Sequence, residues 1–422
     1  MENLNGKRLL ILGGSLWKNA IKKAAEEFGI TLIAAGKDIN AGIFEISAEG
    51  YGIDSTDSES LINLIKEKNI DGVYMGGSEA VINSVCSTLN SIGMPCYCTH
   101  EQWDYLQNKS NFKELCIKNG LPVVPKFSLD SVKDSDFPVI TKPVDGSGSR
   151  GFSVCQNRQE LSEGYKSAAE VSPTNSVMIE KYVRNDSVVV FYTVSNGEII
   201  FSGLEDKYPV RYRGTGSYVG GLFVFESSLT DKFRTKYEAT IQNMISSIGI
   251  REGSFWIEVF IDSDNFYFNE VGYRYGGSAS IYPVNYLYRI NQVSMDIYYA
   301  LTGKSCKGGF ISLFPKNTPR KKHYAVYPVY AQKGQITDIA GVKEIEKNPD
   351  ILEFLTVKGK GNVVTTGTFA QVVALVHMVF DSLDELKENI ALIHNKFRIY
   401  DENRQNIVVK ILDTNTLILK NE

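Results

Sequence analysis

Two glutamates inside otherwise apolar, strand-like runs constrain the fold of this chain more than any other feature. Glu258 lies within FWIEVFI and Glu270 within FYFNEVG, and turn-forming residues separate the two runs. If a three-residue loop is centred on Asp264, Asp262 faces Phe266. Counting outward from that pair, Glu258 then faces Glu270 on one side of a hairpin. Directly opposed Cβ atoms lie about 4.5 to 5.5 Å apart, so two carboxylates there repel each other and require a positive partner.

The positive partner that fits best is a magnesium ion. Burying even one unpaired charge is costly, and Mg²⁺ is commonly held by one or two carboxylates together with substrate phosphates. A pair of metal ions about 3.5 to 4 Å apart fits as well. The alternative is that one glutamate faces solvent or pairs with a basic residue such as Arg274. Bulky apolar neighbours on both sides of Glu258 favour the metal, and Arg274 can then stabilise charge during phosphoryl transfer.

A glycine-rich segment follows the strand-like run that contains Lys142. Small residues let backbone N–H groups crowd around phosphate oxygens, and a preceding lysine adds compact positive charge. The segment joins two strands and therefore differs from a Walker loop, in which the lysine follows the glycines and opens a helix. A glycine-rich segment by itself is more often a surface hairpin. Because the glutamate pair occurs in the same chain, we favour a phosphate-binding site. The residues assigned to it are Lys142, Gly146, Ser147, Gly148, Ser149 and Gly151.

Two further segments are chemically ambiguous. The run at 177–183, VMIEKYV, is apolar until its end, which is typical either of a plain strand terminus or of an adenine-binding strand end. The basic and aromatic segment at 207–221, which includes Arg211 and Arg213, is predicted to be a loop. It either holds an anionic substrate or is solvated.

The remaining sequence predicts several domains. Strand-like and helical patterns alternate over roughly the first 95 residues, for example a strand at 7–13 and a helix from Trp17 that ends at Gly29; this alternation predicts a doubly wound parallel sheet. The middle is mixed α+β and contains a hairpin signal at Asn196-Gly197. From about Lys307, strand-like runs and a helix near 383–395 predict a smaller third domain.

Composition excludes several functions. The formal net charge of -4 shows no basic excess, so nucleic acid is not an expected partner. No stretch approaches the roughly 18 uninterrupted apolar residues of a membrane span. Six scattered cysteines and four isolated histidines indicate reduced thiols and no zinc site. We therefore expect a cytoplasmic protein that does not associate with membranes.

The order of these pieces resembles the ATP-grasp superfamily across most of the chain, and most closely its carbamoyl-phosphate-synthase-like members and L-amino-acid ligases. The shared features are the strand-and-helix N-terminal part, the lysine before a helix in NKSNFKELC, the strand lysine with its glycine loop, the adenine strand end and the two acidic residues near an arginine. The resemblance implies a fold of the α/β and α+β classes. It predicts a Rossmann-like domain at 1–98, an ATP-grasp domain at 99–306 with a lid at about 125–185, and a small α+β domain at 307–422.

The resemblance also assigns roles to individual residues. Lys109 and Lys142 would contact ATP phosphates, and Glu258 and Glu270 would bind Mg²⁺, with Mn²⁺ as an alternative. The adenine and ribose would be held by Glu180, the backbone of Tyr182 and Val183, and Asp186.

Two positions depart from the family pattern. Gly272 stands where many members have an asparagine, although Asn269 could compensate. Asp186 stands where many have a glutamate for the ribose, so the ribose assignment rests on a different side chain.

The implied activity is ligation of a small carboxylate to an amine through an acylphosphate, with release of ADP and phosphate, in an enzyme that could be a homodimer. Two alternatives remain open. One is a carboxylase-type enzyme that phosphorylates bicarbonate. The other, favoured by Gly272, is a regulatory protein that binds ATP without turnover.

Overall fold

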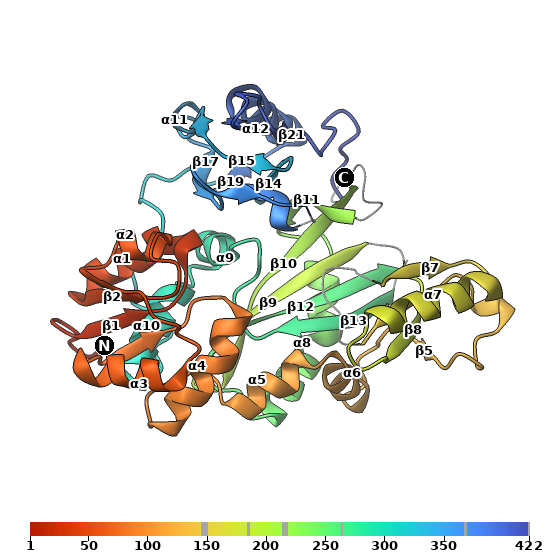
Figure 1. The fold of residues 1–422 in the computed structure, drawn as a ribbon, viewed down its shortest axis with the longest axis horizontal. Helices are drawn as coiled ribbons and strands as arrows, with labels where there is room; N and C mark the ends of the chain where they lie inside the picture. Colours follow the sequence, from red (N-terminus) through yellow and green to blue (C-terminus); the bar gives the residue numbers. More distant parts are fainter. Residues whose placement is uncertain (145–150, 184–185, 213–217, 263–264, 367–368, 421–422) are drawn as a thin grey trace.

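The structure is a computed structural model that describes residues 1–144, 151–183, 186–212, 218–262, 265–366 and 369–420. An N-terminal unit and a lid unit flank a large central sheet, and the C-terminal strands lie above them (Figure 1). Among the described helices, none combines the length and the apolar character needed to cross a membrane.

The N-terminal unit is a four-stranded parallel sheet in the order β3-β2-β1-β4. The predicted alternation of strands and helices is confirmed, and Gly29 ends α1 in the left-handed conformation, with a φ of 67°. The short elements β3 and α2 were not predicted, because three or four residues carry no usable periodicity. The elements are β1 (Arg8–Ile11), α1 (Lys18–Phe28), β2 (Thr31–Ala35), α2 (Gly42–Glu45), β3 (Glu49–Tyr51), α3 (Ser58–Glu67), β4 (Gly72–Tyr74) and α4 (Glu79–Ser91).

Two helices, α5 (His100–Gln107) and α6 (Lys109–Lys118), lead to the lid unit. The lid is a four-stranded antiparallel sheet in the order β5-β8-β6-β7. Its small core includes Val139, Leu161 and Ile179. The elements are β5 (Lys126–Phe127), β6 (Val139–Pro143), β7 (Ser153–Cys155), α7 (Arg158–Val171) and β8 (Val177–Lys181).

The central sheet begins with the strand order β13-β12-β9-β10-β11. The hairpin turn predicted at Asn196-Gly197 is confirmed, and both residues have positive φ, 52° and 79°. The loop prediction for 207–221 is wrong at both ends, because β10 continues to Arg211 and pairs there with β11. The elements are β9 (Ser187–Ser195), β10 (Glu198–Arg211), β11 (Tyr218–Phe225), α8 (Thr230–Ser247), β12 (Gly253–Asp262), β13 (Asn265–Gly272), α9 (Ile281–Tyr288) and α10 (Gln292–Thr302).

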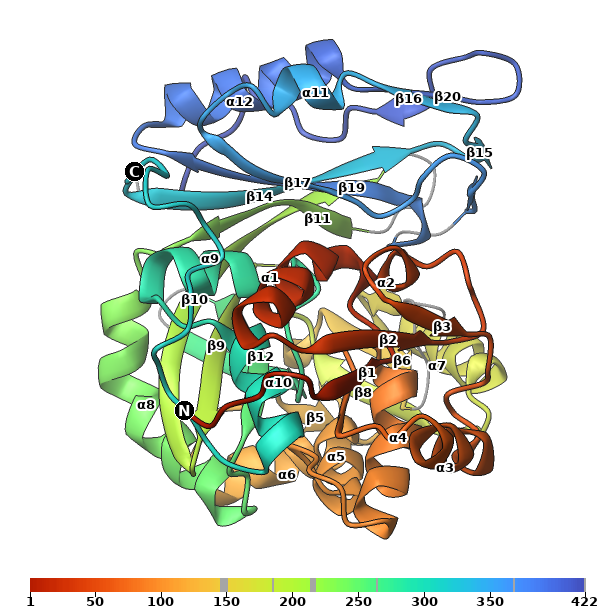
Figure 2. The same cartoon turned by 90° about the vertical axis from the view of Figure 1, so that its left-hand side faces the viewer.

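The C-terminal strands continue the same sheet. β14 pairs with β11, for example Val224 with Ala325, and the order runs on through β19 to β17. Helices α11 and α12 cover the outer side of these strands (Figure 2). The sequence suggested a domain boundary at residue 306. Strands from both sides of that boundary lie in one continuous sheet. The main elements are β14 (His323–Ala331), α11 (Val342–Ile345), β17 (Ile351–Thr356), β19 (Val372–Phe380), α12 (Leu383–Lys396) and β21 (Val408–Val409).

Four short strands complete the C-terminal part as two antiparallel pairs. They are β15 (Gly334–Gln335) with β18 (Val363–Val364), and β16 (Asp338–Ala340) with β20 (Arg398–Tyr400).

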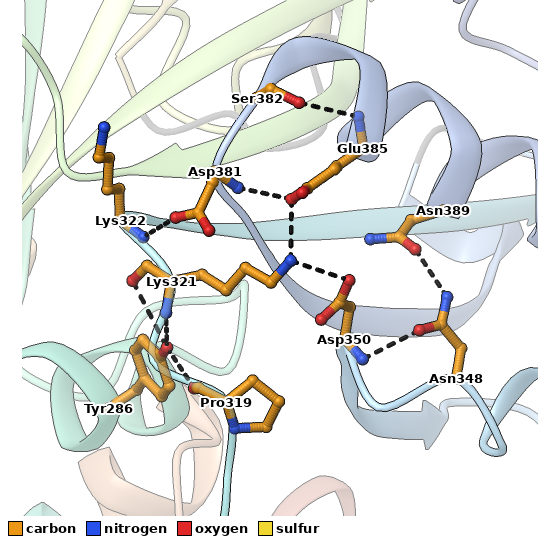
Figure 3. A network of polar contacts seen from close by, with 10 residues as sticks. All are labelled: Tyr286, Pro319, Lys321, Lys322, Asn348, Asp350, Asp381, Ser382, Glu385 and Asn389. Carbon is orange, nitrogen blue, oxygen red and sulfur yellow. Dashed lines mark hydrogen bonds and ion pairs between the residues drawn. The ribbon is translucent and has the colours of Figure 1, made fainter.

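The segment between α10 and β14 is held by polar contacts (Figure 3). The Lys321 Nζ atom lies 3.0 Å from a carboxylate oxygen of Glu385 and 3.3 Å from one of Asp350. The Tyr286 hydroxyl accepts a hydrogen bond from the Lys321 N–H at 2.8 Å and donates to the Pro319 carbonyl at 2.7 Å. These bonds connect the segment that leads into β14 with α9, α12 and the residue just before β17.

Candidate active site

The glutamate hairpin has the predicted pairing, although the predicted turn is wrong. Glu258 lies opposite Glu270, but Asp262 pairs with Asn265 instead of Phe266. The turn is thus one residue shorter than predicted, and its residues 263–264 lie outside the described residues. A β-bulge at Asn269 adds one residue to β13 and restores the register.

Each glutamate contacts a lysine. The Lys207 Nζ atom contacts a carboxylate oxygen of Glu258, and the Lys109 Nζ atom lies 3.4 Å from Glu270. Asn269 donates from its amide to the other oxygen of Glu258 at 2.9 Å. Burial opposes a charge on Glu258, but the Lys207 ammonium holds the pKa of this carboxyl below its ordinary value. The sequence had offered the alternative that a glutamate pairs with a basic residue such as Arg274. In the structure both glutamates pair with a basic residue, but the partners are Lys207 and Lys109.

The two carboxylates have the donor chemistry that Mg²⁺ requires, since this ion takes oxygen ligands and few of them from the protein. Over the described part of the chain, no cluster of three or more His, Cys, Asp or Glu side chains could hold a metal by itself. Glu258 and Glu270 would therefore hold the ion together with phosphate and water oxygens, and the flexible lysine side chains could turn towards the phosphates.

Arg274 is engaged by the N-terminal unit. Its Nη2 and Nε atoms donate to one carboxylate oxygen of Glu79 at 2.7 and 3.0 Å. The guanidinium also lies over the ring of Trp256, 5.3 Å from the centroid. Glu79 is the first residue of α4, so this ion pair connects the N-terminal unit to the glutamate hairpin.

Trp256 gives a structural reason for Gly272. The two residues face each other across β12 and β13, and a Cβ atom at position 272 would lie 2.4 Å from the indole ring. An asparagine cannot occupy this position unless Trp256 moves. The bulged Asn269 donates its amide to Glu258, and its compensation for the missing asparagine stays a prediction.

Glu180 joins two lysines in a buried cluster. One carboxylate oxygen lies 2.6 Å from the Lys142 Nζ atom, and the other contacts Lys113. The Lys113 and Glu180 side chains are each only 1% exposed. Burial lowers the pKa of Lys113 to about 8, although Glu180 opposes that change. Because Lys142 reaches the end of the predicted adenine strand, these two assigned residues do lie together.

A cavity that we call the tail cavity lies between β10 and the C-terminal segment. Its lining includes Tyr182, Asp186, Lys207, Tyr208, Leu417 and Lys420. The Tyr182 N–H already donates to the Pro138 carbonyl at 3.0 Å, so this group is not available to adenine. Val183 is half-buried. Gly151 is described, whereas Gly146, Ser147, Gly148 and Ser149 lie outside the described residues.

Lys420 closes one side of the tail cavity. Its ammonium contacts a carboxylate oxygen of Asp186, the residue predicted to bind the ribose. The ammonium also lies over the Tyr208 ring, 5.3 Å from the centroid, and the Lys420 N–H donates to the Tyr208 hydroxyl at 2.8 Å. Asp186 and Lys420 are 234 positions apart in the sequence, so only the fold connects them.

A second cavity, which we call the sheet cavity, lies on one face of the central sheet and contains both predicted metal-binding glutamates and Arg274. It has a volume of about 370 Å³, a size typical of small-molecule sites. Alternate residues of neighbouring strands point into it, such as Glu205 and Lys207 on β10. Lys207 lines both cavities and contacts Glu258, so the two cavities share a wall residue that lies next to the glutamate pair.

Glu205 is a buried acid that the sequence analysis did not identify. It accepts a hydrogen bond from the Ser278 hydroxyl at 2.8 Å, and burial raises its pKa to about 8. Lys113 was also missed, although it lies one helical turn after Lys109. A charge next to an apolar run, similar to the pattern that identified Glu258, could have indicated Glu205, which follows IIFSGL and begins the charged stretch Glu205-Asp206-Lys207. Lys420 has no comparable pattern around it.

Comparisons with known proteins identify the domain family and the fold. Residues 135–281 match the model of the ATP-grasp domain family. The formate-dependent phosphoribosylglycinamide formyltransferase of Wolinella succinogenes is 24% identical over 299 residues, which cover 64% of this chain and 70% of that protein. The phosphoribosylamine–glycine ligase of Pyrococcus abyssi is 28% identical over 236 residues, covering 52% and 53%.

Solved structures have a similar fold. Phosphoribosylglycinamide synthetase from Anaerococcus prevotii superposes with a TM-score of 0.73 at 17% identity, over 94% of this chain and all of that one. L-amino acid ligase from Bacillus licheniformis gives a TM-score of 0.72 at 17% identity and the same coverage. The biotin carboxylase domain of Hydrogenobacter thermophilus 2-oxoglutarate carboxylase, in complex with MgADP, gives 0.72 at 17% identity over 93% and 90%. This chain therefore contains an ATP-grasp domain and has the ATP-grasp fold, as the sequence resemblance predicted.

Proposed function

We propose that this chain is an ATP- and Mg²⁺-dependent ligase that joins a carboxylate to an amine through an acylphosphate and releases ADP and phosphate. Carbon–nitrogen bond formation by an ATP-grasp ligase is the activity class of the curated relatives. The observation that carries the proposal is the opposed pair Glu258 and Glu270 next to Lys207, which lines both cavities.

The tail cavity suits ATP, and the sheet cavity suits the two reacting small molecules. The predicted adenine strand end and Asp186 line the first cavity, and the phosphates would extend towards Lys142 and Lys109. Glu258 and Glu270 would then hold Mg²⁺ beside the phosphates. Mn²⁺ would fit the same carboxylates, because it also accepts oxygen ligands.

Phosphoryl transfer needs positioning and charge neutralisation more than covalent help from the protein. A carboxylate oxygen of the first substrate attacks the γ-phosphorus, a C–O–P linkage forms, and ADP leaves. The amine nitrogen then attacks the carbonyl carbon, phosphate leaves, and the nitrogen loses a proton. When bound, Mg²⁺ would neutralise charge on the phosphates. Arg274 lines the sheet cavity, which supports our proposal that it stabilises charge developing on the reacting groups.

We also propose that the chain works on small molecules in the cytoplasm, without nucleic acid. It divides at about residues 98 and 306 into N-terminal, grasp and C-terminal parts. It forms a homodimer.

The test is ADP release from Mg-ATP with pools of amino acids, other carboxylates or bicarbonate, with hydroxylamine present to trap an acylphosphate. A hydroxamate in the amino-acid or carboxylate pools would support the proposal and identify the donor. Turnover with bicarbonate alone would instead indicate a carboxylase-type enzyme. Measurable ATP binding without turnover in every pool would indicate a regulatory protein.

We expect Lys420→Ala to raise the KM for ATP several-fold with little change in kcat. The substitution removes a cation from the tail cavity and leaves the Asp186 carboxylate unpaired beside a polyanionic ligand. Steady-state kinetics with varied ATP would measure the change. Lys420→Arg, which keeps the charge, should behave like the wild type, and Lys410→Ala removes an equal charge from the same C-terminal segment as a control. A KM that Lys420→Ala leaves unchanged would argue against ATP in the tail cavity.

A further inference from the structure

We propose that one of the two substrates carries an uncharged, apolar side chain, which packs on the wall of the sheet cavity built by β11, β14 and β19. The inference rests on the proposed ligase function and adds a substrate class to it. The compounds that fit are amino acids with aliphatic or aromatic side chains.

Over the described residues, charged side chains line only one side of the sheet cavity, where they lie among the apolar Val189, Phe191 and Trp256. The charged lining residues on strands come from β13, β12 and β10, at one side of the sheet. The strands that follow β10 in the sheet, β11, β14 and β19, contribute apolar side chains and one glycine. These residues are Gly220, Phe223, Pro328, Tyr330, Val372 and Leu375.

The polar atoms of the apolar wall are already satisfied. The Tyr330 hydroxyl donates to the Gly220 carbonyl at 3.0 Å, which leaves its ring as the cavity surface. Leu375 is 4% exposed, and Phe223 is half-buried. Val372 and Leu375 are three residues apart on β19, yet both line the cavity. The pairing of β14 with β19 has a β-bulge between Val329 and Tyr330, which shifts the register there. A charged group against this wall would lose its hydration without gaining a partner, whereas an apolar group gains by leaving water.

The two cations of the sheet cavity already face carboxylates, and the proposed phosphoryl transfer uses them for ATP and the reacting groups, so neither is left for a phosphate carried by a substrate. Among its described lining residues, Lys207 and Arg274 are the cationic side chains, and they pair with Glu258 and Glu79. A phosphoribosyl group, which is part of the compounds named for the curated relatives, would need further donors on the opposite wall. The buried Glu205 carboxyl and the Ser278 hydroxyl instead offer oxygen acceptors to a substrate ammonium.

The first experiment compares ADP release for leucine, phenylalanine, glycine, aspartate and phosphoribosylglycinamide, each with Mg-ATP and alanine as the fixed second substrate, and subtracts the release with alanine alone. We expect kcat/KM for leucine and phenylalanine to exceed the values for glycine and aspartate by at least about tenfold. A preference for aspartate or phosphoribosylglycinamide would overturn the inference while leaving the ligase function intact. ADP release with none of the compounds would count against the proposed function itself.

The second experiment locates the effect on the wall. Leu375→Ala should lower kcat/KM for leucine by about tenfold or more and leave the KM for ATP unchanged. Val376→Ala is the matched control, because this equally buried side chain of the same strand packs in the other core, with Phe354 and Ile390. Equal losses in the two variants, or no loss in Leu375→Ala, would contradict the inference. Should Leu375→Ala not fold, Phe223→Leu tests the same wall at a half-buried position.

Discussion

Glu270→Gln should lower Mg²⁺-dependent ADP release by roughly 10²- to 10³-fold, the loss typical when one preorganised electrostatic group is removed from a transition state. The substitution keeps the shape of the side chain but removes the negative charge that faces Glu258 across the hairpin. Only one carboxylate would then remain for the ion. Steady-state ADP release at increasing Mg²⁺ concentrations would measure the effect, and the thermal shift produced by MgADP would report binding without turnover.

The control for this prediction is Glu238→Gln, which removes an equal charge from a glutamate that pairs with Arg234 on α8. It should leave both activity and the Mg²⁺ dependence unchanged. Glu270→Gln should also unfold at a temperature close to that of the wild type, because Glu270 is 31% exposed in its side chain and its partner Lys109 is 45% exposed. Wild-type activity in Glu270→Gln would remove this residue from the metal site.

Glu180→Gln should lower the free energy of unfolding by about 3 to 5 kcal/mol, the cost of removing one partner from a buried ion pair. The substitution leaves Lys113 fully buried and Lys142 largely buried without a counter-ion. It should also weaken ATP binding, because the two ammonium groups would repel each other next to the predicted adenine strand end. Chemical denaturation would measure the change in the free energy of unfolding. Steady-state kinetics would measure the KM for ATP and so report the weaker ATP binding.

A double-mutant cycle provides the control. Lys113→Met replaces the buried ammonium with an apolar side chain of similar size and leaves Glu180 paired with Lys142. We expect it to cost less stability than Glu180→Gln. In the double variant, the two changes should cost less than the sum of the single effects, because the same pair is broken only once. Additive effects would mean that the cluster does not act as a unit.

Local sequence patterns were sufficient to predict the secondary-structure elements and turns that depend only on neighbouring residues. The N-terminal alternation and the Asn196-Gly197 hairpin were both predicted, because each follows from a short-range periodicity or a turn preference. The opposition of Glu258 and Glu270 was predicted as well. The prediction succeeded because the bulge at Asn269 compensates for a turn one residue shorter than assumed.

The partners of the assigned residues depended on tertiary structure. Glu79 and Arg274 are 195 positions apart, and Asp186 and Lys420 are 234 apart, so no local pattern connects either pair. The pairing of β11 with β14 likewise could not be predicted, because residues as distant in the sequence as Val224 and Ala325 pair in it and no local pattern connects them.

The sequence by itself determined the ATP-grasp class, the hairpin with its two glutamates and the strand lysine Lys142. Only the tertiary structure decided which charges neutralise each other, that Trp256 occupies the space above Gly272, and that apolar C-terminal strands form the far wall of the sheet cavity. The physical reason is that periodicity and turn chemistry act over a few residues. Ion pairs, close packing and cavity walls instead depend on which distant segments the sheet order brings together.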